Sequence, residues 1–213
     1  MAINPEIAEQ AAARHAEVLG QPPRLPPLPR ESVADEVQAA TRHLRGGVGS
    51  GGAAMPLEAI PEIMFTMCRY PQLWQKYMDL SIEIQGANAV LPVRERKLAI
   101  LRTGWLCQAP YEFGEHVNQA RRAGFTCEEI AAIVAGSSAP NWTAHERAIL
   151  RAAEELHETA MVSDETWAQL ELGLSEYQRT ELLILIGQFV ATAYFQNALR
   201  LRLEPGNEGL MAR

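Results

Sequence analysis

Apolar residues recur at helical spacing from Pro56 to Leu203, and this periodicity limits the folds open to the chain more than any other feature. Leu98, Leu101 and Trp105, for example, follow one another at intervals of three and four residues. No segment alternates between apolar and polar residues with the period of two that a half-buried strand requires. The sequence therefore predicts an all-α fold, a helical bundle.

Start and stop signals divide this region into separate helices. Thr126 and Thr143 each stand three residues before a glutamate, the spacing of a capping box. Gly124 is placed to end the preceding helix, and Ser175 to begin the last one. The expected helices cover residues 61–68, 70–85, one that begins at 92, 111–123, 127–135, 144–157, 163–173 and 176–203.

The N-terminal quarter has a different composition. Residues 6–19 can form a helix, and the proline-rich stretch QPPRLPPLPRES then ends it. Such a stretch can pack as an extended arm on the body or on a neighbouring subunit, or can serve as a ligand for a small recognition domain. A second helix is expected from Ser32 to about Arg45, and the glycine-rich run 46–54 is expected to be a flexible connector or a lid. The predicted organisation is an arm (1–55), a helical domain (56–203) and a tail (204–213).

The composition excludes several classes of function. A net charge of −7 argues against nucleic-acid binding, which needs concentrated Lys and Arg. The sequence has no run of about 18 apolar residues and no N-terminal secretory pattern, so a membrane span and export are not expected. The three cysteines are widely spaced and the histidines show no ligand spacing, so we predict no disulfide framework, no metal and no cofactor. A cytoplasmic protein is the simplest interpretation.

One pair of residues can carry chemistry. Glu112 and His116 are four residues apart on an expected helix, so their side chains share a face. A carboxylate can orient an imidazole and raise its basicity, which suits acid–base catalysis, although the same spacing is common between plain surface neighbours. Gly114 gives this face little bulk, for close packing or for ligand access, and Phe113 is bulky enough to wall a pocket.

Five further residues are candidates for binding a substrate. Arg94 and Arg96 could hold a carboxylate, or could form ordinary ion pairs at the start of a helix. Trp105 and Tyr111 could line an aromatic pocket, or could be core residues. Asn197 lies in an otherwise apolar helix, where it could bond a ligand or cross-link helices.

Several motifs resemble the carboxymuconolactone decarboxylase family, which shares its fold with the alkyl hydroperoxidase D proteins. The pattern L-P-x-R-x-R-x-L-A-I-L-R occupies residues 91–102, Tyr-Glu-Phe-x-x-His occupies 111–116, and ARRAGFTCEEI occupies 120–130. The apolar stretch 182–199 is similar to the closing helix of the family. The resemblance covers about residues 56–203 and implies an alkyl hydroperoxidase D-like bundle.

The resemblance also distinguishes two kinds of chemistry. The peroxidase branch has two cysteines and an upstream glutamate, and here these positions hold Ala109, Glu112 and Lys97, with Cys107 two residues too early. The decarboxylase branch has Glu-x-x-x-His at this place, as here. The resemblance thus implies a cofactor-independent lyase acting on a small carboxylated or carbonyl compound, with His116 and Glu112 catalytic. A thiol peroxidase that uses Cys107 and a non-catalytic oligomeric binding protein are the alternatives.

The same resemblance implies a homotrimer or a homohexamer. The last helix, from Leu182 to Leu203, is apolar over most of its circumference, and a helix of this kind is normally buried on all sides. It can be buried at the centre of one subunit or between subunits, so the sequence is compatible with the oligomer without requiring it.

Overall fold

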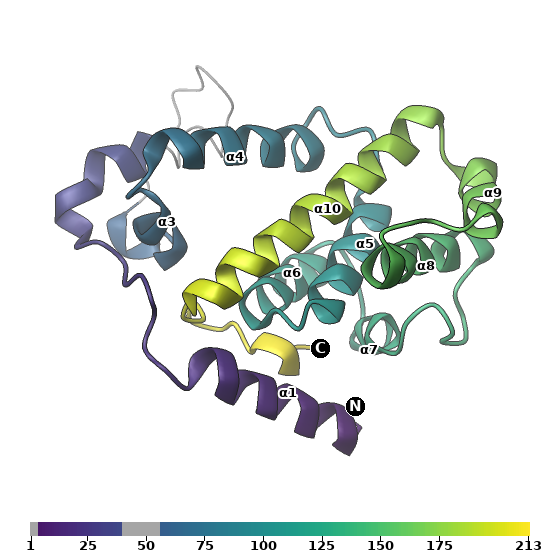
Figure 1. Cartoon of the computed structure of the whole chain (residues 1–213), viewed down its shortest axis with the longest axis horizontal. Coiled ribbons are helices and arrows are strands. Elements are labelled where there is room, and N and C mark those ends of the chain that lie inside the picture. The colour runs from purple at the N-terminus through teal and green to yellow at the C-terminus, as the bar shows by residue number, and fades with distance from the viewer. Residues whose placement is uncertain (1–3, 40–55) are drawn as a thin grey trace. The chain divides into compact units, whose positions relative to one another are not determined.

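A computed structural model of the chain describes residues 4–39 and 56–213 (Figure 1). These residues form helices and contain no strand, which confirms the all-α prediction. They divide into two compact units: unit 1 contains residues 4–21 and 90–213, and unit 2 contains residues 22–39 and 56–89. The division into arm, helical domain and tail remains a prediction.

Unit 1 is built around α5, which packs against four other helices, α6, α7, α8 and α10. Leu98, Ile100 and Leu101 of α5 are fully buried, as their helical spacing predicts. In Figure 1, α10 runs across α5 and α6. The elements of unit 1 are α1 (Pro5–Leu19), α5 (Val93–Leu106), α6 (Pro110–Arg122), α7 (Cys127–Ala135), α8 (Ala144–Thr159), α9 (Asp164–Gly173), α10 (Glu176–Leu199) and the 3₁₀ helix η3 (Gly209–Met211).

The expected N-caps are present. Thr126 begins α7 and Thr143 begins α8, and each forms both hydrogen bonds of a capping box. Ser175 begins α10 in the same way, with Gln178 as the partner. Gly124 follows α6 with a positive φ of 95°, a conformation that glycine adopts without strain. These local signals therefore place the end of α6 and the starts of α7, α8 and α10.

The last helix is shorter than the sequence suggests. Arg200 adopts the left-handed conformation (φ 57°), so α10 ends at Leu199 rather than near Leu203. The amide of Leu201 donates a hydrogen bond back to the carbonyl of Gln196 (3.1 Å), the closure typical of a helix that stops at a left-handed residue. Apolar residues beyond this point belong to the returning chain, which the apolar pattern alone does not distinguish from more helix.

The C-terminal segment returns over α6, where it explains Gly114. Asn207 donates from Nδ2 to the carbonyl of Tyr111 and to Glu115 (both 2.9 Å), and its Oδ1 accepts from the amide of Gly209 (2.7 Å). A Cβ atom on Gly114 would lie 1.8 Å from Asn207 Oδ1. Close packing, and not ligand access, is therefore the reason for this glycine.

The same segment fixes α1. His15 is partly buried, and its Nε2 accepts a hydrogen bond from the amide of Leu210 (2.9 Å). Arg14 donates from Nε to the carbonyl of Gln108 (2.9 Å). Helix α1 is thus bonded both to the C-terminal segment and to the link between α5 and α6.

Helix α10 is long and apolar enough to cross a membrane by length and composition alone, a test that core helices of soluble proteins also pass. Its side chains Glu181, Gln188 and Gln196 are buried. The carboxylate of Glu181 accepts hydrogen bonds from the amides of Val90 (3.0 Å) and Leu91 (2.8 Å). Buried polar groups with partners inside unit 1 are what a core helix requires.

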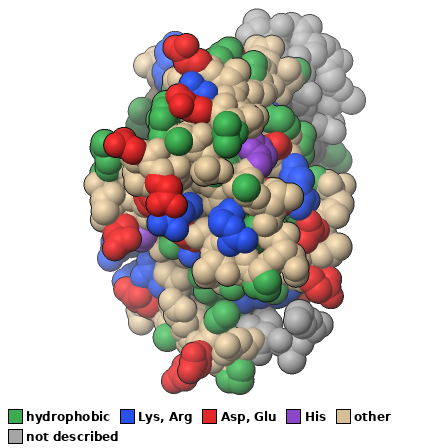
Figure 2. All heavy atoms as spheres, turned by 90° about the vertical axis from the view of Figure 1, so that its right-hand side faces the viewer, with side chains coloured by type: hydrophobic (Ala, Val, Ile, Leu, Met, Phe, Trp, Pro, Cys, Tyr) green, Lys and Arg blue, Asp and Glu red, His purple; other side chains and the backbone are tan. Residues whose placement is uncertain are grey.

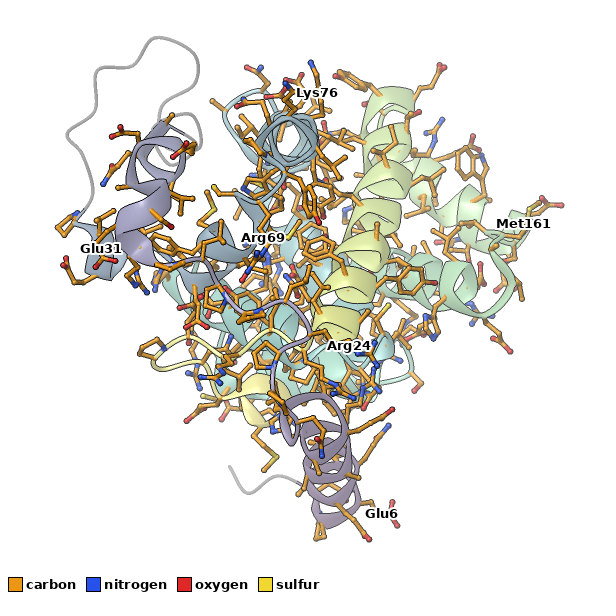
Figure 3. The ribbon with its side chains drawn as sticks, turned by 60° about the vertical axis from the view of Figure 1, so that its left-hand side comes forward. Glu6, Arg24, Glu31, Arg69, Lys76 and Met161 are labelled. Carbon is orange, nitrogen blue, oxygen red and sulfur yellow. The ribbon has the colours of Figure 1, made fainter. Side chains whose placement is uncertain are left out.

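In unit 2 the proline-rich segment packs on a helix of the same unit. The amide of Leu28 donates to the carbonyl of Phe65 (3.1 Å), and the Arg30 guanidinium lies over the Phe65 ring (4.3 Å). Arg69, labelled in Figure 3, donates to the carbonyl of Pro26 (2.5 Å). The expectation of an arm that packs on the body thus holds within unit 2. Its elements are η1 (Arg30–Val33), a helical stretch over 34–39, η2 (Leu57–Ala59), α3 (Glu62–Met67) and α4 (Pro71–Gln85).

The helix expected over residues 32–45 is described in part. Residues 34–39 are helical, after the 3₁₀ turn η1. The remainder of that helix and the glycine-rich run 46–54 lie outside the described residues.

Candidate active site

The pair predicted from the sequence is formed and buried. Glu112 lies in the first turn of α6, and His116 lies one turn later on the same face. His116 Nε2 is 3.0 Å from Glu112 Oε1, and the two residues are only 8% and 4% exposed. The imidazole meets the ring of Phe189 edge to face, with 4.9 Å between centroids. The pair is therefore enclosed by the core and is not a surface contact.

A second helix fixes the orientation of the carboxylate. Gln196 of α10 donates from Nε2 to Glu112 Oε2 (2.6 Å). Both carboxylate oxygens of Glu112 are thus engaged, one by the imidazole and one by the amide. In this contact the carboxylate oxygen is the acceptor and the imidazole is the donor, so His116 carries its proton on Nε2. The lone pair of Nδ1 then faces the opposite side, away from Glu112.

Lys97 lies on that opposite side. Its Nζ is 3.3 Å from His116 Nδ1 and donates a hydrogen bond to Gln119 Oε1 (2.6 Å). Lys97 comes from α5, so the contact joins α5 to α6. From the sequence, Lys97 was recognised only as a departure from the family pattern, in which this position is a glutamate. The sequence does contain one signal that could have pointed to Lys97. The chain has only two lysines, Lys76 and Lys97, and Lys97 is the one that lies within the family motifs.

The surroundings favour the uncharged form of both basic groups. Burial and, to a smaller extent, the nearby positive charge of Arg96 lower the pKa of Lys97 from 10.5 to about 8, against the raising effect of Glu112. Burial also lowers the pKa of His116, against the raising effect of Glu112. His116 is therefore a neutral imidazole at pH 7, and a substantial fraction of Lys97 is a neutral amine near pH 8.

Arg94 is engaged elsewhere. Its guanidinium forms ion pairs with Glu129 and Glu146, both at 2.7 Å, and lies 4.9 Å from the ring centroid of Phe125. The two carboxylates belong to the capping boxes of α7 and α8. This arrangement matches the ion-paired alternative predicted from the sequence, so the guanidinium of Arg94 is not available to bind a substrate carboxylate.

Figure 2 shows the face that carries α8 and α9, where acidic and basic side chains are interspersed.

Arg96 is the better candidate for holding a carboxylate. It adjoins Lys97 in the chain, and its Nη1 atom is buried without a hydrogen-bond partner among the described residues. Burial lowers its pKa, and the charge of Glu181 opposes this effect. A guanidinium N–H that is buried and unpaired can donate to an incoming anion.

The other three binding candidates have partners within the protein. Tyr111 is buried and donates from its hydroxyl to Glu204 Oε1 (2.8 Å). Trp105 is 7% exposed and belongs to the core. Asn197 donates from Nδ2 to the carbonyl of Cys107 (3.3 Å). These contacts correspond to the core and cross-linking alternatives that the sequence left open.

Cys107 and Cys68 do not have the surroundings of reactive thiols. Burial, and secondarily the charge of Glu112, raises the pKa of Cys107 to about 11. Burial also raises the pKa of Cys68, which lines a cavity of about 200 Å³ in unit 2 together with Glu36 and Trp74. A reactive thiolate requires a lowered pKa. Within residues 4–39 and 56–213, no group of three or more His, Cys, Asp and Glu side chains is arranged to hold a metal ion.

Solved structures with the same fold are known. An uncharacterised peroxidase-related protein from Ralstonia eutropha JMP134, described as an alkylhydroperoxidase AhpD core, is 14% identical with a TM-score of 0.69, over 86% of this chain and 94% of that one. The debrominase Bmp8, in complex with 2,3,4-tribromopyrrole, is 17% identical with a TM-score of 0.67, over 88% and 95%. A peroxidase-related protein from Silicibacter sp. TM1040 is 13% identical with a TM-score of 0.67, over 88% and 94%. The protein therefore has an alkyl hydroperoxidase D-like helical fold.

The family match in sequence covers a shorter part of the chain than the structural matches do. Residues 69–155 match the carboxymuconolactone decarboxylase family, and this segment contains Lys97, Glu112 and His116. No curated protein sequence matches the chain. The resemblance predicted from the motifs is confirmed: residues 69–155 are similar to the carboxymuconolactone decarboxylase family.

Proposed function

We propose that the protein is a cofactor-independent enzyme that transfers protons on a small carboxylated or carbonyl compound, with His116 as the catalytic residue and Glu112 as its partner. A decarboxylase-like lyase reaction is the leading form of this chemistry. The observation that supports the proposal is the unbroken line of contacts Lys97–His116–Glu112–Gln196, which crosses three helices. A buried polar line of this kind costs free energy unless all its members are bonded, and function is a good reason to keep it.

The geometry determines which atom would act. Nε2 of His116 is held by Glu112, so the substrate would meet the side of the ring that carries Nδ1 and Lys97. Decarboxylation breaks the bond between the carboxylate carbon and its neighbour, and the electron pair moves into an adjacent carbonyl group to give an enolate. That carbon must then take up a proton, which the Lys97–His116 pair can deliver. The unpaired Nη1 of Arg96 would hold a carboxylate of the substrate before the bond breaks.

A panel of β-keto and vinylogous acids, assayed for release of carbon dioxide, tests the proposal. His116→Ala should lower turnover by about two to four orders of magnitude, the usual contribution of a positioned general acid or base. His145→Ala is a matched control, because His145 Nε2 also pairs with a glutamate, Glu95, at 3.2 Å but belongs to no such line of contacts. The control should keep full turnover.

Two results would count against the proposal. Full activity in folded His116→Ala would remove the role of the imidazole. Absence of turnover with every compound in the panel, together with measurable binding of one of them, would favour the non-catalytic binding protein instead. The thiol peroxidase alternative receives less support, because the pKa of Cys107 is raised and not lowered.

We also propose that the protein is cytoplasmic and forms a homo-oligomer. A cytoplasmic location fits free cysteines, since reducing conditions keep thiols unpaired. A homotrimer or homohexamer fits the exposed apolar side chains on α10, Ile184 (45% exposed) and Tyr194 (69% exposed), which a partner subunit could cover.

A further inference from the structure

The amine of Lys97 has a property that proton transfer by His116 does not require. We infer that Lys97 is a nucleophile that forms an imine with the carbonyl group of the substrate, so that the reaction proceeds through a covalent adduct with the enzyme. This inference rests on the proposed function for the identity of the substrate class. It assigns to Lys97 a role in bond formation that is separate from the role of His116.

The contacts of Lys97 leave its lone pair free. Both neighbours of Nζ are acceptors: Gln119 presents Oε1 at 2.6 Å, and His116 presents Nδ1 at 3.3 Å, because its proton is on Nε2. A neutral amine has two N–H groups and one lone pair. The two N–H groups satisfy the two acceptors, and the lone pair points elsewhere. The site thus orients a neutral amine for attack on a carbon atom.

The charges around Lys97 keep a neutral fraction available. Arg96 on α5 disfavours the ammonium form, and Glu112 on α6 favours it, while His116 is neutral. Desolvation is the largest effect and lowers the pKa to about 8. Lysines that are desolvated or adjacent to another cation are the ones that attack carbonyl groups in enzymes.

Lys97 is also the accessible member of the line. His116 and Glu112 are buried, whereas Lys97 and Gln119 are partly exposed. A molecule that enters from solvent therefore meets the amine before it meets the imidazole. Arg96, next in the chain and with Nη1 unpaired, can hold a carboxylate beside the attacked carbonyl.

The chemistry balances without an added reagent. The lone pair of Lys97 attacks the carbonyl carbon, the C–N bond forms, and the carbonyl oxygen leaves as water after taking up two protons. In a β-keto acid the resulting iminium accepts the electron pair of the bond to the carboxylate, and carbon dioxide departs. The enamine carbon then takes up a proton that comes from solvent and is passed on by Nδ1 of His116, and water hydrolyses the resulting iminium to release the ketone, the free amine and one proton.

The chain supplies its own internal control, because it contains two lysines, Lys76 and Lys97. Lys76 is exposed on α4 and points away from the helices in Figure 3. The intact protein would be treated at pH 8 with acetylacetone, which forms a stable enaminone with reactive amines and needs no carboxylate-binding residue. A parallel sample would receive acetoacetate followed by sodium borohydride, and peptide mapping would locate the modified amines, the N-terminal amine included.

Lys97 should react with acetylacetone at least about tenfold faster than Lys76, because an amine with a pKa near 8 is roughly half neutral at pH 8 and an ordinary lysine is under about 1% neutral. The Lys97 rate should rise with pH, reach half of its maximum near pH 8 and level off about one pH unit higher. Lys97→Arg should abolish this modification, because it keeps a cation but has no nucleophilic amine. Lys76→Arg should leave it unchanged. Borohydride should trap a reduced isopropyl group on Lys97, the adduct expected once acetoacetate has lost carbon dioxide.

The outcomes separate this inference from the proposed function. Turnover that depends on His116, with Lys97 no more reactive than Lys76 and no trapped adduct, overturns the imine and leaves proton transfer intact. An adduct on Lys97 without any turnover that depends on His116 supports the reactive amine and contradicts the proposed function. Failure of both the labelling and the turnover overturns both.

Discussion

Lys97→Met should remove a rise in the free energy of unfolding that the wild-type protein shows above about pH 8. The buried ammonium of Lys97 has its pKa lowered from 10.5 to about 8. Each pKa unit corresponds to about 1.4 kcal/mol, so at neutral pH the charged form destabilises the folded state by about 3 kcal/mol relative to the neutral form. Methionine has a similar length and no charge, and it removes this penalty.

The sign follows from the protons bound in each state. Below about pH 8 both the folded and the unfolded protein hold the Lys97 proton, so the penalty is constant there. Between about pH 8 and 10.5 the folded state has lost this proton and the unfolded state still holds it. The wild-type protein therefore gains stability as pH rises through this window, by up to about 1.4 kcal/mol per pH unit. The Met variant lacks that gain.

Urea unfolding of the wild type, Lys97→Met and Lys76→Met, repeated from pH 7 to 10, measures the effect. The advantage of Lys97→Met over the wild type should be constant up to pH 8 and then shrink by about 2 to 3 kcal/mol as pH 10 is approached. Arg96 and Glu112 carry the charges that face Lys97, and the lowered pKa of His116 keeps its imidazole neutral in this window. Loss of the hydrogen bond to Gln119 adds an offset that does not change with pH.

Lys76→Met is the control for the substitution itself, and it should differ from the wild type by an amount independent of pH because Lys76 is exposed. Parallel curves for the wild type and Lys97→Met across pH 8 to 10 would refute the reasoning. That result would mean that the folded protein keeps the Lys97 proton as firmly as the unfolded chain, and that the amine is not desolvated.

Three further predictions follow from the fold and the cysteines. Gly114→Ala should destabilise the protein by about 1 to 3 kcal/mol in urea unfolding, because its Cβ would overlap Asn207 Oδ1 at 1.8 Å. Gly187→Ala is the control and should stabilise the protein by about 0.5 to 1 kcal/mol, because its Cβ would have nothing within 4 Å. Similar losses of stability in both variants would contradict this account. Folded Cys107→Ser should keep its turnover, as should the wild type after chelation, and loss of activity in either case would revive the thiol or metal alternative. Light scattering should give a mass three or six times 23.5 kDa, and a concentration-independent monomer peak would rule out the oligomer.

The helices could be predicted well because their signals are local. Thr126, Thr143 and Ser175 bond to groups within three residues of themselves, so the sequence alone contains both partners of each cap. The same holds for Glu112 and His116, which one helical turn brings together. The end of α10 was misplaced, because a left-handed Arg200 has no strong local signature.

Contacts between helices could not be predicted in this way. Lys97 is 19 residues from His116 and reaches it only because α5 and α6 pack together. Asn207 covers Gly114 from the far end of the chain, and a glycine in a helix does not reveal what lies against it. The sequence therefore indicates one pair of the candidate site, whereas the amine beside it and the amide behind it depend on the tertiary fold.

The motif at residues 91–102 contains both a residue that supports the fold, Arg94, and a residue of the candidate site, Lys97. Arg94 holds Glu129 and Glu146, and each of these carboxylates also accepts the amide of the threonine that caps its own helix. One guanidinium thus ties together the starts of α7 and α8, which is a contribution to architecture. A search pattern built on Arg94 and these glutamates would retrieve proteins of this shape whatever they catalyse, whereas a pattern that also requires Lys97 and His116 would select those able to share its chemistry.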